Sequence, residues 1–283
     1  MAVIVSRSRR GAVVVTLYGA STTGLDLRLQ RFLEAGLDVV AVSNNDIERP
    51  GISCTVLVQN RNAGGLAGGL NRGVEVALQR GSNVITLLDQ DSEVDADTIL
   101  KLQQTVSAST DLVVGPAVWD LDRQQWHTKS RPPRMLITSG STFTTRTWQR
   151  VGAYHDWMEI DYLDHEWCSR ARQKRCTLKV IPETCLTQRF GVRHPNLIAH
   201  KLGLQLYSPY RRAIALRNLR WLIKQDYVPL DIRMKEGIKM LIKPWLWLIF
   251  EQDRLANLRS IRVGLIAKCE EAFPRHWLGT QSS

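Results

Sequence analysis

The first half of the chain alternates short apolar runs with helix-like segments, and this alternation limits the folds open to it. Runs rich in Val, Ile and Leu predict buried strands; they lie at 12–17, 37–42, 54–58 and 83–88. Apolar residues at helical spacing predict helices between them; these span 25–35, 66–79 and 96–107. Such alternation is typical of a mainly parallel sheet with helices on both faces. We therefore expect an α/β fold.

The second half is less regular and becomes helical. The pattern predicts short strands at 112–114 and 135–138, a helix from about 161–164 to 174, and strands at 177–181 and 184–190. Ser208 is a suitable N-cap and Pro209 a suitable first residue for a helix over 210–224. Another helix begins near Leu230, and Pro244 is expected to kink or restart it.

The net charge of +11 is concentrated in the last third of the chain. Residues 189–283 contain 17 Lys or Arg but only 7 Asp or Glu. An anionic partner is expected there. Nucleic acid is disfavoured, because no recognisable module and no interleaved stacking aromatic residues accompany the charge. The five cysteines show neither a disulfide pattern nor zinc-ligand spacing, so a cytosolic protein is expected.

One basic segment in this region is amphipathic. Lysines recur at 235, 239 and 243, and apolar residues recur at helical spacing at Met234, Ile238, Leu241, Ile242, Trp245 and Ile249. Such a helix suits an anionic membrane surface. The alternative is a helix that packs its apolar stripe on the rest of the protein.

Asp89 and Asp91 follow the predicted strand at 83–88. Two carboxylates two residues apart at a strand end point the same way, and this end of an open α/β sheet is where ligands bind. Paired carboxylates suit Mg²⁺ or Mn²⁺, which take oxygen ligands and share them with substrate phosphates. The alternative is a solvated loop.

A glycine-rich turn and an acidic helix start are further candidates. The turn at 62–73 joins a strand to a helix, where glycines permit close approach to an anion; tight helix–sheet packing explains the glycines equally well. Its spacing disfavours a dinucleotide fingerprint. Asp161, Asp164 and Glu166 lie at a predicted helix N-terminus, where a carboxylate stays charged and can accept a proton. Ordinary capping with a Glu166–Arg170 pair is the alternative.

Four motifs occur in order and together carry a resemblance. They are N-x-G-x-x-x-G-G-x-N-x-G from Asn62, L-L-D-Q-D-S from Leu87, T-S-G-S from Thr138 and D-x-x-D-x-E-W-C-x-R-A from Asp161. The series resembles the family 2 glycosyltransferases, especially the rhamnosyltransferase-like branch that builds bacterial surface polysaccharides such as O-antigen. The segments Y-S-P-Y-R-R from Tyr207 and R-N from Arg217 resemble that branch's H-S-P-x-R and R-N segments.

The resemblance implies a GT-A fold, a nucleotide-sugar donor and a divalent metal. Asp91 would be the main metal ligand, with Asp89 on the ribose and metal side of the donor. Donor contacts are implied for Thr16, Ser43, Asn62, Gly64 and Asn71. Asp164 matches the general base of inverting members. Acceptor-binding or supporting roles are implied for Ser139, Gly140, Asp161, Glu166 and Arg170.

Three positions depart from the family pattern. Ser43 stands where an Asp commonly contacts the base, and Asp46 is a candidate substitute. Gln188 and Tyr207 replace two histidines, for which His194 is a candidate replacement. The departures keep open a catalytically silent relative that serves as a membrane-bound scaffold.

The resemblance leads us to expect a nucleotide-sugar-binding domain at 1–200 and a helical, basic, acceptor- or membrane-facing region at 201–283. We expect inverting transfer of L-rhamnose from dTDP-L-rhamnose to a lipid-linked glycan, by a protein peripheral on the cytoplasmic face of the membrane. A UDP-hexose or UDP-galactofuranose donor is the alternative.

Overall fold

The computed structural model describes residues 11–19, 23–45, 51–127, 133–274 and 276. Its centre is a sheet with the strand order β3-β2-β1-β4-β7-β5-β6, and β8 pairs with β5. The strands that make parallel pairs are β1 (Gly11–Leu17), β2 (Asp38–Ser43), β3 (Val56–Gln59), β4 (Val84–Asp89), β5 (Leu112–Asp120) and β8 (Thr177–Gln188). Two short strands pair antiparallel: β6 (Gln125–Trp126) and β7 (Thr142–Thr144). The predicted mainly parallel α/β fold is confirmed.

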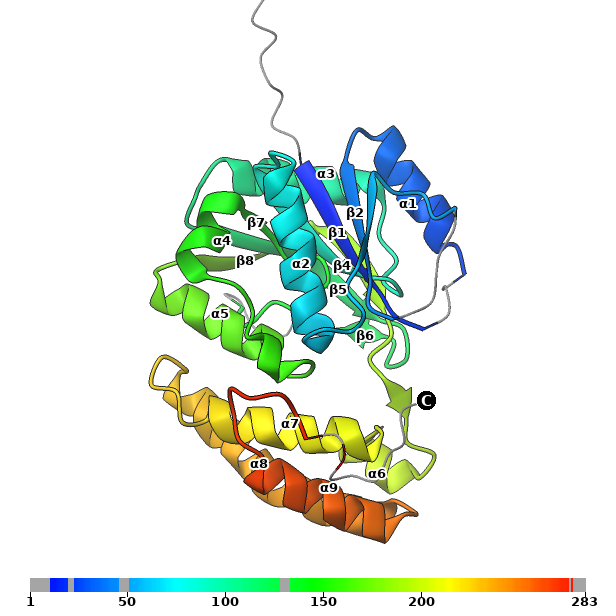
Figure 1. Cartoon of the computed structure of the whole chain (residues 1–283), viewed down its shortest axis with the longest axis vertical. Helices are drawn as coiled ribbons and strands as arrows, with labels where there is room; N and C mark the ends of the chain where they lie inside the picture. The colour runs from blue at the N-terminus through cyan, green and yellow to red at the C-terminus, as the bar shows by residue number, and fades with distance from the viewer. Residues whose placement is uncertain (1–10, 20–22, 46–50, 128–132, 275, 277–283) are drawn as a thin grey trace, which may run out of the picture.

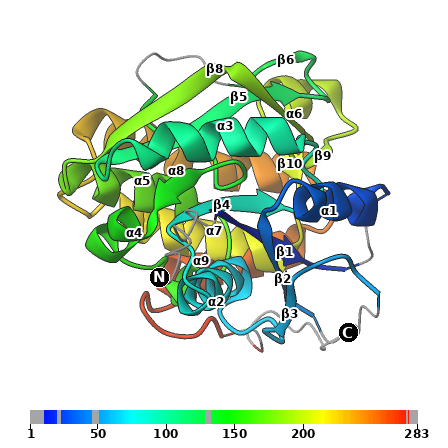
Figure 2. The ribbon, with the colours of Figure 1, turned by 90° about the horizontal axis from the view of Figure 1, so that it is seen from above.

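Helices cover both faces of this sheet (Figures 1 and 2). Side chains alternate along a strand, so Val14 of β1 packs with one helical layer, while Val13 and Val15 pack with the other. The first layer contains α2 (Gly65–Gln79), α4 (Thr145–Val151) and α5 (Leu163–Gln173). The second contains α1 (Leu25–Glu34) and α3 (Ala96–Ser107).

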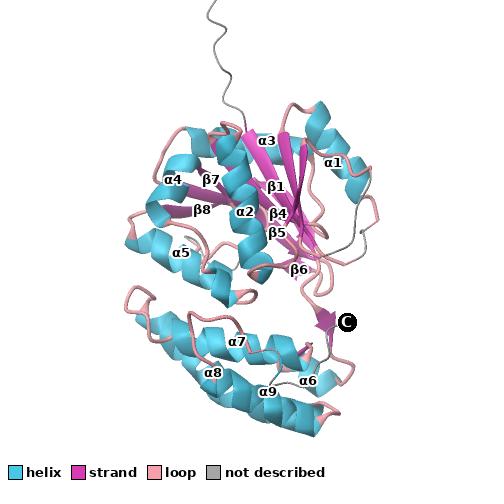
Figure 3. Cartoon of the chain, viewed as in Figure 1, coloured by secondary structure: helices cyan, strands magenta, loops and turns pink. Residues whose placement is uncertain are grey.

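The C-terminal helices lie across the edge of the sheet where β1, β2 and β4 end (Figures 1 and 3). A short α6 (Leu197–Lys201) lies between β9 (Val192–Arg193) and β10 (Gln205–Leu206). Three longer helices follow: α7 (Pro209–Leu222), α8 (Leu230–Phe250) and α9 (Arg254–Ile266). No helix in the described part of the chain combines the length and apolar character needed to span a bilayer. The division at residue 200 stays a prediction.

Several predicted elements differ from the structure. Residues 135–138 form no strand, because the backbone of Leu136 contacts the Cys168 thiol of α5 instead of a neighbouring strand. The two strands predicted at 177–181 and 184–190 are one strand, β8, whose pairing with β5 shifts register between Pro116 and Ala117. α8 continues through Pro244, so no restart occurs there. The pattern predicted neither α4 nor α9.

Candidate active site

The strand ends bring three predicted donor-binding residues to one edge of the sheet. In the register of β1 with its neighbours, Thr16 is opposite Asp89 and Leu17 is opposite Ser43. Thr16 and Ser43 are buried, and the Ser43 hydroxyl lies 3.1 Å from the Asn45 Oδ1. Asp46, the candidate substitute at the base, lies outside the described residues. This edge is where open α/β sheets bind ligands.

A cavity of about 570 Å³ lies between this edge and the C-terminal helices. Asp89 and Asp91 line it from the end of β4, and Asp164 lines it from the first turn of α5. Its volume is in the range of small-molecule sites, about 300–1,000 Å³. The pair of carboxylates and the separate carboxylate therefore face one shared space, which a transfer reaction between two substrates requires.

Burial and a neighbouring carboxylate disfavour the ionised form of Asp89. Burial, and then the negative charge of Asp91, raise its pKa from 3.8 to about 6, although a hydrogen bond from Gln188 opposes this. The Gln188 Nε2 donates to Asp89 Oδ2 at 3.1 Å. Ser139 supports the strand end, because its hydroxyl accepts from the Asp89 N–H and lies 2.7 Å from the Ser92 hydroxyl.

The oxygen atoms at this strand end fit a divalent cation. Within the described ranges, no group of three or more His, Cys, Asp and Glu side chains could hold a metal ion. Mg²⁺ and Mn²⁺, however, commonly use one or two carboxylates and complete their shell with water and substrate phosphates. Asp89 and Asp91 supply such carboxylates. The Gln188 Oε1 is buried, and it has no hydrogen-bond partner among the residues described, so it offers a third oxygen.

Asp164 is held by the residue that follows it. The His165 backbone N–H donates to Asp164 Oδ1 at 2.8 Å, and the ring Nδ1 lies 2.9 Å from the same oxygen. Burial raises the pKa of Asp164, but the charge and hydrogen bonds of His165 outweigh burial, so the pKa lies below 3.8. Asp164 is therefore an ionised carboxylate at neutral pH that can accept a proton.

The loop before α5 is strained and is held from α7. Glu159, Asp161 and Tyr162 have φ values of 58°, 62° and 64°, a region that non-glycine residues adopt rarely and at a cost. The buried Asn218 amide donates to the carbonyls of Met158, Ile160 and Asp161. The R-N segment of α7 thus fixes the loop that leads into Asp164.

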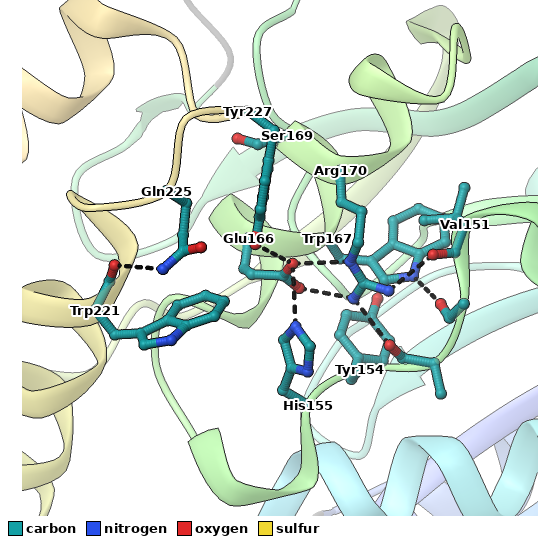
Figure 4. A network of polar contacts seen from close by, with 12 residues as sticks. Val151, Tyr154, His155, Glu166, Trp167, Ser169, Arg170, Trp221, Gln225 and Tyr227 are labelled. Carbon is teal, nitrogen blue, oxygen red and sulfur yellow. Dashed lines mark hydrogen bonds and ion pairs between the residues drawn. The ribbon is translucent and has the colours of Figure 1, made fainter. Parts of the chain in front are cut away.

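Glu166 and Arg170 lie behind the cavity and not in its lining. Arg170 donates two hydrogen bonds of 2.8 Å to Glu166, and the Tyr227 hydroxyl donates one of 2.9 Å (Figure 4). His155 Nε2 lies 3.5 Å from the same carboxylate (Figure 4). Tyr227 lies between α7 and α8, so this buried network links the C-terminal helices to α5. The Glu166–Arg170 pair at i, i+4, which belonged to the capping alternative, is therefore present.

The glycine-rich turn contacts protein atoms. A Cβ on Gly64, which has a φ of 65°, would lie 2.9 Å from the Asp156 Cβ. Asn71 donates to the carbonyl of Tyr154 and accepts from its N–H. Both residues therefore hold the segment that precedes α5, and not the sheet of the packing alternative. Asn62, the first residue of this turn, has a φ of 55°. Donor contacts by these three residues stay predictions.

The departures from the family pattern fall in different places. Gln188 and Tyr207 line the cavity. His194 does not: it is buried beside Glu251, at 3.9 Å, and its Nδ1 accepts from the backbone of Asn196. The prediction that His194 replaces a family histidine at the metal or diphosphate is therefore wrong. Gly140 adopts a φ of 83°, and its N–H donates to the Leu87 carbonyl at 2.7 Å. Gly140 therefore stabilises the end of β4.

Other residues of the cavity were not predicted as site residues. Arg211 of α7 donates two hydrogen bonds of 2.9 Å to Asp161 and lies over the Tyr207 ring at 4.1 Å. Lys239 and Lys243 of α8 also line the cavity. The motif Y-S-P-Y-R-R contains Arg211, but only the tertiary structure brings it beside Asp161.

The comparisons with known proteins agree with this geometry. The family model described as glycosyl transferase family 2 matches residues 44–163. The chain is 24% identical to a dTDP-rhamnosyl transferase, RfbF of Shigella flexneri, over 88% of this chain and 91% of that protein.

Solved structures share the fold at low sequence identity. S. aureus TarS matches with a TM-score of 0.57 and 12% identity over 90% of this chain, which spans about half (48%) of that chain. TarS 1-349 in complex with UDP-GlcNAc gives a TM-score of 0.56 at 14% identity, covering 90% of this chain and 79% of that one. The structure of GalNAc-T7 with UDP, GalNAc and Mn²⁺ matches with a TM-score of 0.52 at 12% identity, over 86% of this chain and 56% of that one. These comparisons therefore support a glycosyltransferase of family 2 with the GT-A fold.

Proposed function

We propose that this glycosyltransferase moves L-rhamnose from dTDP-L-rhamnose to a lipid-linked glycan, with inversion at the anomeric carbon. The relationship to a dTDP-rhamnosyl transferase over 88% of the chain supports the donor. The observation that carries the proposal is the shared cavity, in which Asp164 faces the same space as Asp89 and Asp91. Such an arrangement lets one side hold a diphosphate and the other side activate a hydroxyl.

In the proposed reaction, Asp164 accepts the proton of the acceptor hydroxyl. The hydroxyl oxygen forms a bond to the anomeric carbon while the bond from that carbon to the diphosphate oxygen breaks, and the nucleoside diphosphate leaves with the electron pair. Attack from the face opposite the diphosphate inverts the anomeric configuration. The proton moves as the new bond forms, so a carboxylate of low pKa suffices if it is well placed. His165 supplies that placement through its two contacts with Asp164.

Asp89 and Asp91, with the Gln188 amide oxygen, would hold Mg²⁺ or Mn²⁺ beside the diphosphate. A bound cation would neutralise the charge that develops on the leaving diphosphate. The raised pKa of Asp89 supports this role, because two close carboxylates in a partly buried position favour a cation. Weaker donor binding by Asp91→Ala in the presence of Mn²⁺ is expected, and a metal-independent wild type would contradict it.

We also propose that α8 and α9 rest on the anionic cytoplasmic face of a membrane. Apolar side chains of α8 are 49–67% exposed; they are Met234, Ile238, Leu241, Ile242, Trp245 and Ile249. The stripe therefore does not pack on the catalytic domain. Two basic residues of α9, Arg259 and Arg262, are also exposed and would complement anionic lipids.

Vesicle binding tests this surface. The paired variant Ile238→Ser with Trp245→Ser should lower the binding constant for anionic vesicles by at least about tenfold, because about 0.8 kcal/mol is lost for each buried CH₂ removed and two such groups already correspond to a factor of ten. Trp126→Ser is the control, since Trp126 is 51% exposed but lies on β6. Equal vesicle binding by the paired variant and the wild type would refute the membrane contact.

A screen of nucleotide sugars with and without Mn²⁺ tests the donor. We expect dTDP to raise the melting temperature more than UDP, and dTDP-L-rhamnose to be consumed fastest. Preference for UDP and a UDP-hexose or UDP-galactofuranose would favour the alternative donor, which Ser43 at the base position leaves open. Failure to bind any nucleotide, together with strong vesicle binding, would favour the scaffold.

A further inference from the structure

Helix α8 has an unusual orientation, with its apolar stripe outward and three charged residues, Glu236, Lys239 and Lys243, facing the cavity. The exposed stripe includes Leu241 and Trp245, each 67% exposed. The residues of the opposite side line the cavity that contains Asp164; they are Glu236, Lys239, Met240, Lys243 and Trp247. An ordinary surface helix shows the reverse pattern. The need for a soluble surface therefore does not explain why these lysines face the cavity.

Of these two lysines, only Lys239 has an ion-pair partner among the residues that the structure describes. Lys239 contacts the buried Glu236, which also accepts from the Tyr162 hydroxyl. Lys243 has no hydrogen bond or ion pair among the residues that the structure describes. Burial, and then the positive charge of Lys239, lower the pKa of Lys243, so its ammonium group is less stable here than in water. An anion in the cavity would remove this penalty.

We propose that Lys239 and Lys243 form a subsite for a phosphate group of the acceptor, close to the hydroxyl that receives the sugar. Both lysines lie on the inner face of α8, one turn apart, so their ammonium groups can contact one phosphate or diphosphate. This proposal rests on the proposed glycosyl transfer and specifies its acceptor. The phosphate is that of a lipid carrier, because the same helix exposes its apolar stripe on the opposite side.

The position of the subsite limits the length of the acceptor. The cavity of about 570 Å³ contains the lysines, Asp164 and the β4 carboxylates, and it must also accommodate the donor sugar. Few sugar rings therefore fit between the phosphate and the reacting hydroxyl. We infer that the enzyme acts early, on a short glycan attached to a lipid phosphate. A reaction that transfers a sugar or sugar phosphate to a lipid phosphate must supply this acceptor.

The test compares two synthetic acceptors that differ only in the phosphate. One is a short-chain alkyl diphosphate glycoside and the other is the neutral alkyl glycoside of the same sugar. Lys243→Gln and Lys239→Gln should each raise the KM for the phosphorylated acceptor by roughly tenfold, the effect of losing a charge-assisted hydrogen bond. The KM for the neutral acceptor and for the donor should stay the same. Lys235→Gln is the matched control, because Lys235 is exposed on the same helix and does not line this cavity.

A binding measurement separates this proposal from the transfer reaction itself. With dTDP at saturation, calorimetric titration of decyl phosphate should give a weaker Kd for Lys243→Gln than for the wild type, whether or not any sugar is transferred. Tighter wild-type binding of decyl phosphate than of inorganic phosphate would identify the lipid phosphate as the source. Equal affinities of wild type and variant, stronger binding of a uronate glycoside than of decyl phosphate, or equal KM changes for both acceptors would overturn the subsite. Loss of donor consumption with decyl phosphate binding intact would refute only the proposed function.

Discussion

Arg211 of α7 holds Asp161 through two parallel hydrogen bonds of 2.9 Å, and Asp161 lies three residues before Asp164. Asp161 has a φ of 62°, in the left-handed region that non-glycine residues rarely adopt. The planar guanidinium matches the carboxylate with both donors. A C-terminal helix therefore controls the backbone that leads into the proposed base.

The first prediction concerns this pair. Arg211→Lys should lower kcat/KM by about tenfold or more, because an ammonium group cannot form both hydrogen bonds and the strained loop relaxes. The free energy of unfolding should change by only about 1 kcal/mol, since both side chains are partly exposed. Steady-state kinetics and urea unfolding measure the two effects.

Arg80→Lys is the matched control for that experiment. Arg80 forms a similar double contact with Asp38, at 2.8 and 3.1 Å, but Asp38 begins β2 at the opposite end of the sheet. The steady-state kinetics of Arg80→Lys should match those of the wild type. Equal loss of activity in both variants would contradict a specific role for Arg211.

Glu166 provides a test of the link between the C-terminal helices and α5 (Figure 4). Burial raises the pKa of Glu166, but His155 and Arg170 outweigh burial and lower it from 4.5 to about 2. Its ionised form thus stabilises the fold fully above about pH 4.5, and this contribution is lost as the pH falls towards 2. Glu166→Gln should cost about 3 kcal/mol at pH 7, because Arg170 loses its buried charge partner.

The milder variant Tyr227→Phe should cost about 1 kcal/mol, since it removes one hydrogen bond and leaves the ion pair. Urea unfolding between pH 3 and pH 7 measures both variants. An equal effect of Glu166→Gln at both ends of that range would show that its charge does not stabilise the fold.

The contribution of Asp89 to the free energy of unfolding should depend on pH in the opposite direction to that of Glu166. Its pKa is raised from 3.8 to about 6, so the folded protein keeps a proton that the unfolded chain has lost. The stability of the ligand-free protein should therefore fall as the pH rises between those values. Asp89→Asn should stabilise the ligand-free protein at pH 7 by up to about 3 kcal/mol and by almost nothing below pH 4.

The same substitution should abolish the effect of Mn²⁺ on donor binding. Asp97→Asn, an exposed position on α3, is the control and should change stability little. Thermal unfolding across the pH range, with and without Mn²⁺ and dTDP, measures these effects. A pH-independent difference between Asp89→Asn and the wild type would contradict the assigned electrostatics.

Local patterns predicted much of the sheet and the carboxylates at its edge. β1, β2 and β4 are short apolar runs, and their parallel register follows from the alternation of strands and helices. The strand predicted at 135–138 failed because an apolar run can equally pack as a loop; Leu136 is buried against Cys168 without a strand partner. Periodicity does not distinguish these cases.

The cavity's other side depends on contacts that are distant in sequence. Asn218 reaches carbonyls about 60 residues earlier, and Arg211 reaches Asp161 across 50 residues. The spacing of the lysines at 239 and 243 predicts a stripe but not the direction in which it faces. Whether a stripe faces solvent or a ligand is decided by the docking of the whole helix.

Asp164→Asn gives the most direct test of the central claim that a carboxylate of α5 activates the acceptor. Transfer from dTDP-L-rhamnose, followed by product formation at saturating donor and Mn²⁺, should fall by about 100-fold or more, the contribution of a general base. The Kd for dTDP should change less than about twofold, because in the proposed site the diphosphate would be held from β4 on the other side of the cavity. Full turnover by Asp164→Asn would contradict the assignment of the base.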